Sequence, residues 1–192
     1  PSAATRSLPW RLLGVHSARM DMGNRDTLLD ESGFFRWTPT TVRLVDQLNL
    51  MSADGLLLLP ARLTRRKNIE RALEVLAEIR QASQRDFRLI VTGPPGPHNP
   101  ANAAYLNELL ALRHQLQIDD CAHFLYQYGV EEGQPLRVDD DTIADLYRLS
   151  DALLFPSLQE GFGIPVLEAG LSGIPAFCAN LPPIRETGRG DI

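Results

Sequence analysis

From residue 55 onward, the chain alternates between two kinds of hydrophobic pattern. Short unbroken apolar runs, such as Gly55–Leu59, are typical of strands that are buried on both faces of a sheet. Between them lie longer segments whose apolar residues recur every three or four positions, which indicates helices with one buried side. The pattern predicts strands at residues 55–59, 87–91, 123–126, 152–155 and 175–178, and helices at about 68–80, 99–116, 142–149 and from 163 onward.

The order of these elements defines a fold class. Strands and helices alternate without hairpin signals, so the strands are expected to run parallel and to be connected by helices. We therefore predict an α/β fold with a Rossmann-like open parallel sheet and helices on both faces. Ligands of such sheets bind beyond the carboxyl ends of the strands. Functional residues are thus expected directly after Leu59, Val91, Tyr126 and Phe155.

The first 50 residues are less regular than the rest. They contain one predicted helix, which Thr38 caps and Pro39 opens. We interpret residues 1–50 as a linker or lead-in segment with one helix, and residues 51–192 as a Rossmann-like domain that is truncated at its carboxyl end. Because the sequence begins without Met, we expect it to be part of a longer protein.

Helix caps are predicted at two further places. Asn99 and Pro100 are expected to open the helix that contains Tyr105. Asp141 is expected to cap the helix Thr142–Leu149. This capping explains the acidic run 139–141 better than a metal site does.

A cluster of cations follows the first predicted strand. Arg62, Arg65, Arg66 and Lys67 fall within six positions, directly before the helix that begins near Asn68. The amino end of a helix already favours anions, so cations there oppose the dipole unless an anion lies between them. The segment alone leaves two interpretations equally open: a phosphate-binding site, or a charged loop in solvent.

The segment after the fourth predicted strand contains a glycine-rich turn. Gly161 and Gly163 permit backbone conformations and close approaches that a side chain would block. Pro165 suits the start of a helix, so the backbone amides of residues 161–164 are expected to face a ligand phosphate.

Two glutamates flank this turn. Glu160 precedes it and Glu168 follows inside the helix, with seven residues between them. Both carboxylates are positioned to accept hydrogen bonds from sugar or ribose hydroxyl groups. The structural alternatives are an exposed loop acid at Glu160 and a first-turn glutamate that balances the helix dipole at Glu168.

Together these motifs resemble the C-terminal domain of the family-4 (group 1) glycosyltransferases. The resemblance spans about residues 55–188 and rests on R-L-x-x-x-K (62–67), V-T-G (91–93), P-S (156–157) and E-G-F-G-I-P-V-L-E (160–168). Members of this family are retaining enzymes with two Rossmann-like domains that face a cleft, the GT-B arrangement. The resemblance implies a hexosyltransferase that moves a sugar from a nucleotide-diphosphate sugar to an acceptor with retention of anomeric configuration. This chain would supply the donor-binding half.

The resemblance also implies roles for individual residues. Arg62 and Lys67 would bind the donor diphosphate and stabilise the departing nucleotide. Glu160 would hold hydroxyl groups of the transferred sugar, and Glu168 would bind the ribose. Such enzymes need no metal, so neither a metal nor another cofactor is expected. The remaining donor contacts are expected from Gly161, Phe162, Gly163 and Ile164 at the sugar and phosphates, from Tyr126 near the base, and from Gly93.

Composition and charge narrow the cellular setting. The net charge of −5 argues against a general nucleic-acid or membrane-surface binder. No apolar run approaches the roughly 20 residues that span a bilayer. Cys121 and Cys178 lack metal-binding spacing and fit buried thiols of a reducing compartment. We expect a cytoplasmic protein, and a peripheral position at the cytoplasmic membrane face is compatible with the full-length protein.

Three other functions are compatible with a sheet of this type to different degrees. A nicotinamide-dependent oxidoreductase is disfavoured because residues 60–67 lack the G-x-G-x-x-G fingerprint. A non-catalytic nucleotide-sugar-binding module and a nucleotide-sugar epimerase remain open, because fold does not fix function. The expected partners are a UDP-, GDP- or ADP-linked sugar and an acceptor sugar or lipid. The acceptor would bind an N-terminal domain that is absent here, so the isolated chain is expected to transfer nothing.

Overall fold

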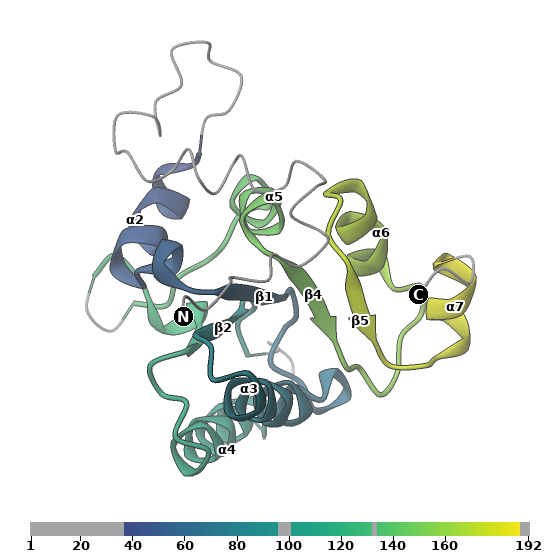
Figure 1. Cartoon of the computed structure of the whole chain (residues 1–192), viewed down its shortest axis with the longest axis horizontal. Coiled ribbons are helices and arrows are strands. Elements are labelled where there is room, and N and C mark those ends of the chain that lie inside the picture. Colours follow the sequence, from purple (N-terminus) through teal and green to yellow (C-terminus); the bar gives the residue numbers. More distant parts are fainter. Residues whose placement is uncertain (1–36, 96–100, 132–133, 189–192) are drawn as a thin grey trace, which may run out of the picture.

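The computed structural model of the protein describes residues 37–95, 101–131 and 134–188, with only the backbone of residues 101–103. Within these ranges it contains one parallel sheet of five strands in the order β3-β2-β1-β4-β5 (Figure 1). The strands are β1 (Gly55–Leu59), β2 (Phe87–Val91), β3 (Ala122–Phe124), β4 (Ala152–Phe155) and β5 (Ala176–Cys178). The predicted parallel α/β fold is confirmed.

Helices cover both faces of this sheet (Figure 1). One face carries α3 (Ile69–Ser83) and α4 (Ala101–Gln115), which pack against each other, and the other carries α5 (Asp140–Leu149) and α6 (Ile164–Leu171). Helix α2 (Pro39–Gln47) lies beside α5, and α7 (Pro182–Thr187) follows β5. Short 3-10 turns occur at Leu50–Ser52, Arg65–Lys67 and Leu125–Gln127. None of the helices in the described ranges is long and apolar enough to cross a membrane.

The central strand β1 is buried along its whole length, as its unbroken apolar run predicts. Leu57 pairs with Leu89 of β2 on one side and with Ala152 of β4 on the other. The helix that follows β1 packs on one face of the sheet and the helix that follows β4 packs on the other (Figure 1). In open sheets of this type, such a switch between the faces marks the place of the ligand crevice at the carboxyl edge.

The predicted third strand is too long at its carboxyl end. It was expected over residues 123–126, but β3 ends at Phe124 and Leu125–Gln127 form a 3-10 turn. The N–H of Tyr128 donates to the carbonyl of Leu125 at 2.9 Å, so the backbone satisfies its hydrogen bonds locally instead of extending the sheet. This turn presents Tyr126 at the carboxyl edge of the sheet.

Two of the predicted helix caps fall in described residues, and one of them is wrong. Thr38 caps α2 as expected, accepting a hydrogen bond from the N–H of Thr41 at 3.1 Å. Helix α5 is capped by Asp139 and not by Asp141, because the Asp139 carboxylate accepts from the N–H of Thr142 at 2.8 Å. Hydrogen bonds from the side chain and then from the backbone N–H of Thr142 lower the pKa of Asp139. The predicted cap at residues 99–100 lies outside the described residues.

A buried hydrogen-bond cluster, which the sequence analysis did not foresee, fixes α2 on α5. The carboxylate of Asp145 is buried, and its Oδ2 accepts from the N–H of Thr38 at 2.8 Å and from the hydroxyl of Thr41 at 2.9 Å. The hydroxyls of Thr38 and Thr142 share a further bond of 2.9 Å. A buried carboxylate is costly unless donors surround it, so this cluster favours one position of α2 on the domain.

His123 in β3 is a buried histidine held in its neutral form. Only 5% of its surface is exposed. Its Nδ1 lies 3.1 Å from the hydroxyl of Tyr128, and its Nε2 is buried without a hydrogen-bond partner among the described residues. Burial, reinforced by the positive charges of Arg88 and Arg113, lowers the pKa of His123 to about 4.

We expect this histidine to make folding stability fall as the pH drops below 6.5. The unfolded chain takes up the proton near a pKa of about 6.5, whereas folded His123 takes it up only near about 4. The contribution of neutral His123 is therefore complete above pH 6.5 and is lost progressively toward pH 4. Because of this residue, the free energy of unfolding measured with urea should be about 2 kcal/mol lower at pH 5.0 than at pH 7.5.

Two variants isolate the effect. His123→Leu removes the titrating group and should flatten the change in stability between the two pH values. Leu171→Ala alters an exposed side chain that does not titrate and should leave the change as in the wild type. An equal pH dependence in the wild type and in His123→Leu would contradict the assignment.

Candidate functional site

A pocket of about 770 Å³ lies at the carboxyl edge of the sheet. It is lined by residues that follow β1, β2 and β3, together with side chains from α5 and α6. Four of the predicted site residues share it: Arg62, Gly93, Tyr126 and Glu168. They are distant in sequence and come together because the carboxyl ends of parallel strands meet at one edge.

The other predicted residues lie outside the lining of this pocket. Lys67 is at the end of the 3-10 turn Arg65–Lys67, on the same connection as Arg62. Glu160 and residues 161–164 belong to the loop between β4 and α6 and to the first residue of α6. The predicted site is thus built in two parts, a pocket and an adjoining pair of loops.

Lys67 and Glu160 form a buried ion pair between those loops. The distance from Nζ to Oε1 is 2.5 Å, and the two side chains are only 10% and 8% exposed. The ammonium group also lies over the ring of Phe155, 4.7 Å from its centroid. Isolated burial of either charge would be strongly unfavourable, so each holds the other in place. The alternative interpretation of this segment, a charged loop in solvent, therefore does not apply to Lys67.

Backbone and side-chain contacts fix the two loops to each other. The N–H of Leu158 donates to the carbonyl of Arg66 at 2.8 Å, and the amide of Asn68 donates to the carbonyl of Pro156 at 3.0 Å. Asn68 has a left-handed backbone (φ 52°) and separates the 3-10 turn from α3. These contacts bring together two charged residues that are 93 positions apart in the sequence.

The remaining cations of this segment differ in their partners. Arg65 is exposed and donates to both carboxylate oxygens of Glu108 at 2.7 Å. Arg66 is also exposed and lies 3.7 Å from Oε2 of Glu160. Exposed pairs of this kind contribute little to stability. Arg62 differs from both, because it forms no hydrogen bond or ion pair with the described residues and lines the pocket.

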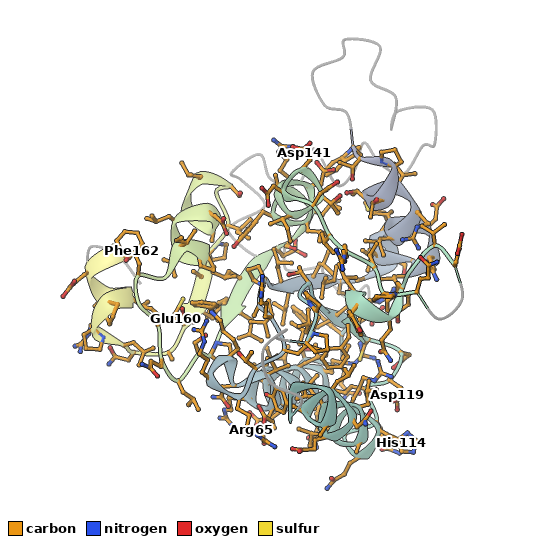
Figure 2. All side chains as sticks on the ribbon, turned by 180° about the vertical axis from the view of Figure 1, so that it is seen from behind. Arg65, His114, Asp119, Asp141, Glu160 and Phe162 are labelled. Carbon is orange, nitrogen blue, oxygen red and sulfur yellow. The ribbon has the colours of Figure 1, made fainter. Side chains whose placement is uncertain are left out.

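The turn at residues 161–163 contains one glycine in a left-handed backbone conformation and one glycine with open space around it. Gly163 has φ 83°, a left-handed conformation, and caps α6. No atom lies within 4 Å of the place that a Cβ at Gly161 would take. Phe162 is 58% exposed. Figure 2 shows Glu160 close to the start of α3 and Phe162 on the side of the loop toward α7.

Gly93 has a clear packing role. A Cβ at this position would lie 2.4 Å from the carbonyl oxygen of Ala61 and 2.6 Å from the Cα of Arg62. Its N–H donates to the same carbonyl at 3.0 Å. The glycine thus lets the segments after β1 and β2 touch, which fixes the backbone of Arg62 at the pocket wall. A direct contact of Gly93 with a ligand stays a prediction.

Glu168 is oriented by a tyrosine that the sequence analysis missed. Tyr147 of α5 is buried, and its hydroxyl donates to Oε2 of Glu168 at 2.7 Å. Burial and this hydrogen bond raise the pKa of Tyr147 far above its usual value, so the hydroxyl keeps its proton and remains a donor. Glu168 lies beyond the first turn of α6, so it does not serve as the first-turn acid of the alternative interpretation. A tyrosine on the buried side of a helix was the available signal, since its hydroxyl needs a partner.

Comparisons with known proteins cover this whole region. Residues 43–189 match the model of a family described as "Glycosyl transferases group 1". O-antigen chain mannosyltransferase B of Escherichia coli is 36% identical over 72 residues, which are 35% of this chain and 19% of that protein. Mannosylglucosylglycerate synthase of Petrotoga mobilis is 25% identical over 154 residues, which are 73% of this chain and 35% of that protein. The chain spans about a fifth to a third of the length of these relatives.

A solved structure has the same fold. Anabaena Alr3699/HepE, crystallised in complex with UDP-glucose, superposes with a TM-score of 0.59 at 20% identity. The match covers 78% of this chain and 36% of that one. At this identity the likeness concerns the architecture of the sheet and its helices.

The two glycines of the turn should respond differently to alanine. Gly163→Ala places a side chain in a left-handed backbone and should destabilise the fold by about 1–2 kcal/mol. Gly161→Ala enters open space and should change stability by less than about 0.5 kcal/mol. Urea denaturation of both variants measures the difference. Equal costs at the two positions would contradict the geometry of the turn.

The hydrogen bond between Tyr147 and Glu168 should appear as a coupling energy. Tyr147→Phe removes the donor and keeps the ring, so it should cost about 1 kcal/mol of unfolding free energy. In a Glu168→Ala background the same substitution should cost clearly less, because the acceptor is already gone. A double-mutant cycle by urea denaturation measures this difference. The same cost in both backgrounds would show that the contact contributes nothing.

Proposed function

The chain belongs to the group 1 glycosyltransferase family, and from this we propose that it forms the donor-binding half of an enzyme that transfers a sugar from a nucleotide-diphosphate sugar. One observation carries the proposal: the pocket at the carboxyl edge combines Arg62, which has no acidic partner among the described residues, with the oriented carboxylate of Glu168. A diphosphate requires an available cation such as Arg62, and the hydroxyl groups of a ribose suit the carboxylate of Glu168.

In this proposal, Arg62 and Lys67 stabilise the leaving diphosphate. Arg62 has its guanidinium donors available for phosphate oxygens. The ammonium of Lys67 has three N–H donors and uses one on Glu160, so two remain for a phosphate. When the bond between the anomeric carbon and the diphosphate oxygen breaks, the electron pair stays on that oxygen. The two cations offset the developing charge, and we propose that no metal or other cofactor is needed.

Glu160 serves two purposes in the same scheme. Its Oε1 holds Lys67, and its Oε2, 3.7 Å from Arg66, is able to accept a hydrogen bond from a hydroxyl of the transferred sugar. Gly161 leaves space for that sugar beside the carboxylate. The exposed ring of Phe162 and the backbone of residues 163–164 complete this side of the donor.

Glu168 binds the ribose in this scheme. Its Oε2 accepts from Tyr147, which leaves Oε1 for a ribose hydroxyl. Because the tyrosine fixes the carboxylate before the ligand arrives, less conformational freedom is lost on binding. The base then extends along the pocket toward Tyr126.

We also propose that transfer retains the anomeric configuration, as in the family-4 enzymes that the motifs resemble. The acceptor, a sugar or lipid, would bind a second domain, in keeping with the greater length of the relatives. Transfer requires both partners to be aligned, so the 192-residue chain alone should bind the donor without transferring sugar. Cys121 and Cys178 are both free thiols, which supports a cytoplasmic setting.

Calorimetric titration of the chain with UDP, GDP and ADP tests the proposal. At least one nucleotide should bind, and Arg62→Ala should weaken it roughly tenfold or more, because a charged hydrogen bond is lost. Arg62 has no partner among the described residues, so this variant should keep wild-type stability. A chelator should leave the affinity unchanged.

Two further variants serve as a control and as a test of the position of the sugar. Arg185→Ala removes an exposed arginine of α7 and should bind as the wild type does. Gly161→Ala should weaken binding of the nucleotide sugar more than binding of the nucleotide. Failure of the folded chain to bind any of the three nucleotides would overturn the donor site. Acceptor-dependent transfer by this chain alone would overturn its assignment as half of an enzyme.

A further inference from the structure

The pocket extends along the carboxyl edge of the sheet from β1 to β3. Arg62 follows β1, Tyr126 lies in the turn after β3, and β2 separates the two strands. Neighbouring strands are about 4.8 Å apart, so these two ends of the pocket are separated by about 10 Å along the edge. A span of this length accommodates a nucleotide with its phosphates at Arg62 and its base at the turn after β3, and Glu168 lines the same pocket.

The pocket wall at this end is mainly apolar. Pro135 and Val138 come from the segment before α5, and Ile143 comes from α5 itself. Val138 and Ile143 are partly buried and pack against the core, so the fold fixes their positions. An apolar wall suits the face of a heteroaromatic base. This wall accommodates the face of every base, so discrimination between bases requires a polar group.

Arg137 is the charged residue at this end of the pocket. Its side chain is exposed and makes no hydrogen bond or ion pair within the described ranges, even with the neighbouring acidic run 139–141. Its backbone is held on both sides. Leu136 is buried and its N–H donates to the carbonyl of Tyr126 at 3.2 Å, while Asp139 caps α5. The guanidinium thus starts from a fixed position at the rim of the pocket and is available to a ligand.

The guanidinium of an arginine presents a planar fork of N–H donors and has no acceptor. It fits a base edge that carries two adjacent acceptors. Guanine offers N7 and O6, whereas adenine offers the acceptor N7 beside an amino donor. Uracil presents O4 beside a C–H group. Among the described residues, no acidic side chain lines this end of the pocket to accept from the amino group of adenine.

We propose that the donor is a guanosine-diphosphate sugar and that Arg137 selects it by donating to N7 and O6 of guanine. The inference rests on the donor site proposed above. Arg137 acts on the choice of nucleotide, whereas Arg62 and Lys67 act on the diphosphate that all candidate donors share.

Calorimetry of the 192-residue chain with five nucleotides separates these contributions. GDP and IDP both carry N7 and O6 and should bind with similar affinity. 7-Deaza-GDP lacks the N7 acceptor and should bind roughly tenfold more weakly. UDP and ADP should also bind at least tenfold more weakly than GDP.

Substitutions of Arg137 then test its role. Arg137→Ala should weaken the binding of GDP to the level of UDP binding and abolish the difference in affinity between GDP and 7-deaza-GDP. Arg137→Lys keeps the charge without the planar fork, so it should lose most of the discrimination as well. Arg185→Ala, which changes an exposed arginine on α7, should preserve the wild-type order of affinities.

The outcomes distinguish this inference from the donor site itself. Tighter binding of UDP or ADP than of GDP, or equal binding of GDP and 7-deaza-GDP, would overturn guanine selection and leave the donor site intact. An equal loss for all nucleotides in Arg137→Ala would make Arg137 a phosphate contact and would also overturn it. If the folded wild-type chain binds no nucleotide, both proposals fail.

Discussion

The parallel pairing of β1 with β4 is the constraint on which the rest of the site depends. These strands are adjacent in the sheet although almost a hundred residues separate them, with Leu57 opposite Ala152. The connections that follow the two strands meet at the carboxyl edge, where the N–H of Leu158 donates to the carbonyl of Arg66. Lys67, which follows β1, is thereby placed against Glu160, which follows β4. Without this pairing, the two motifs would have no common surface.

The charges at this edge are arranged by burial. Lys67 and Glu160 are both buried and neutralise each other at 2.5 Å, so neither is free to leave without exposing the other to an apolar environment. Arg62 and Arg137 are exposed and lack partners in the described part of the chain, and both line the pocket. The fold thus combines a fixed internal pair with two available cations. This arrangement suits a ligand that enters from solvent with an anionic group for Arg62 and acceptor atoms for Arg137, and that meets a site already ordered.

Much of the architecture was accessible from local pattern. The unbroken run of β1 and the amino-terminal cap of α2 follow from rules that act over a few residues, and the structure agrees with them. These rules gave wrong predictions where the chain could form other local hydrogen bonds. Asp139 and Asp141 are both plausible caps, and only the backbone path selects Asp139. The third strand ended early because its residues found hydrogen bonds in a 3-10 turn.

Local sequence patterns predict the five strands, the helices between them, the parallel class of the sheet, and which turns carry charged or glycine-rich motifs, whereas α7 and the 3-10 turns were not predicted. Only the folded chain shows that Lys67 faces Glu160, that Tyr147 orients Glu168, and that Arg137 shares a pocket with Arg62. The physical reason is the range of the forces involved. Hydrophobic periodicity and capping act between neighbours in the chain, whereas ion pairs and pocket walls join residues that only the strand order brings together.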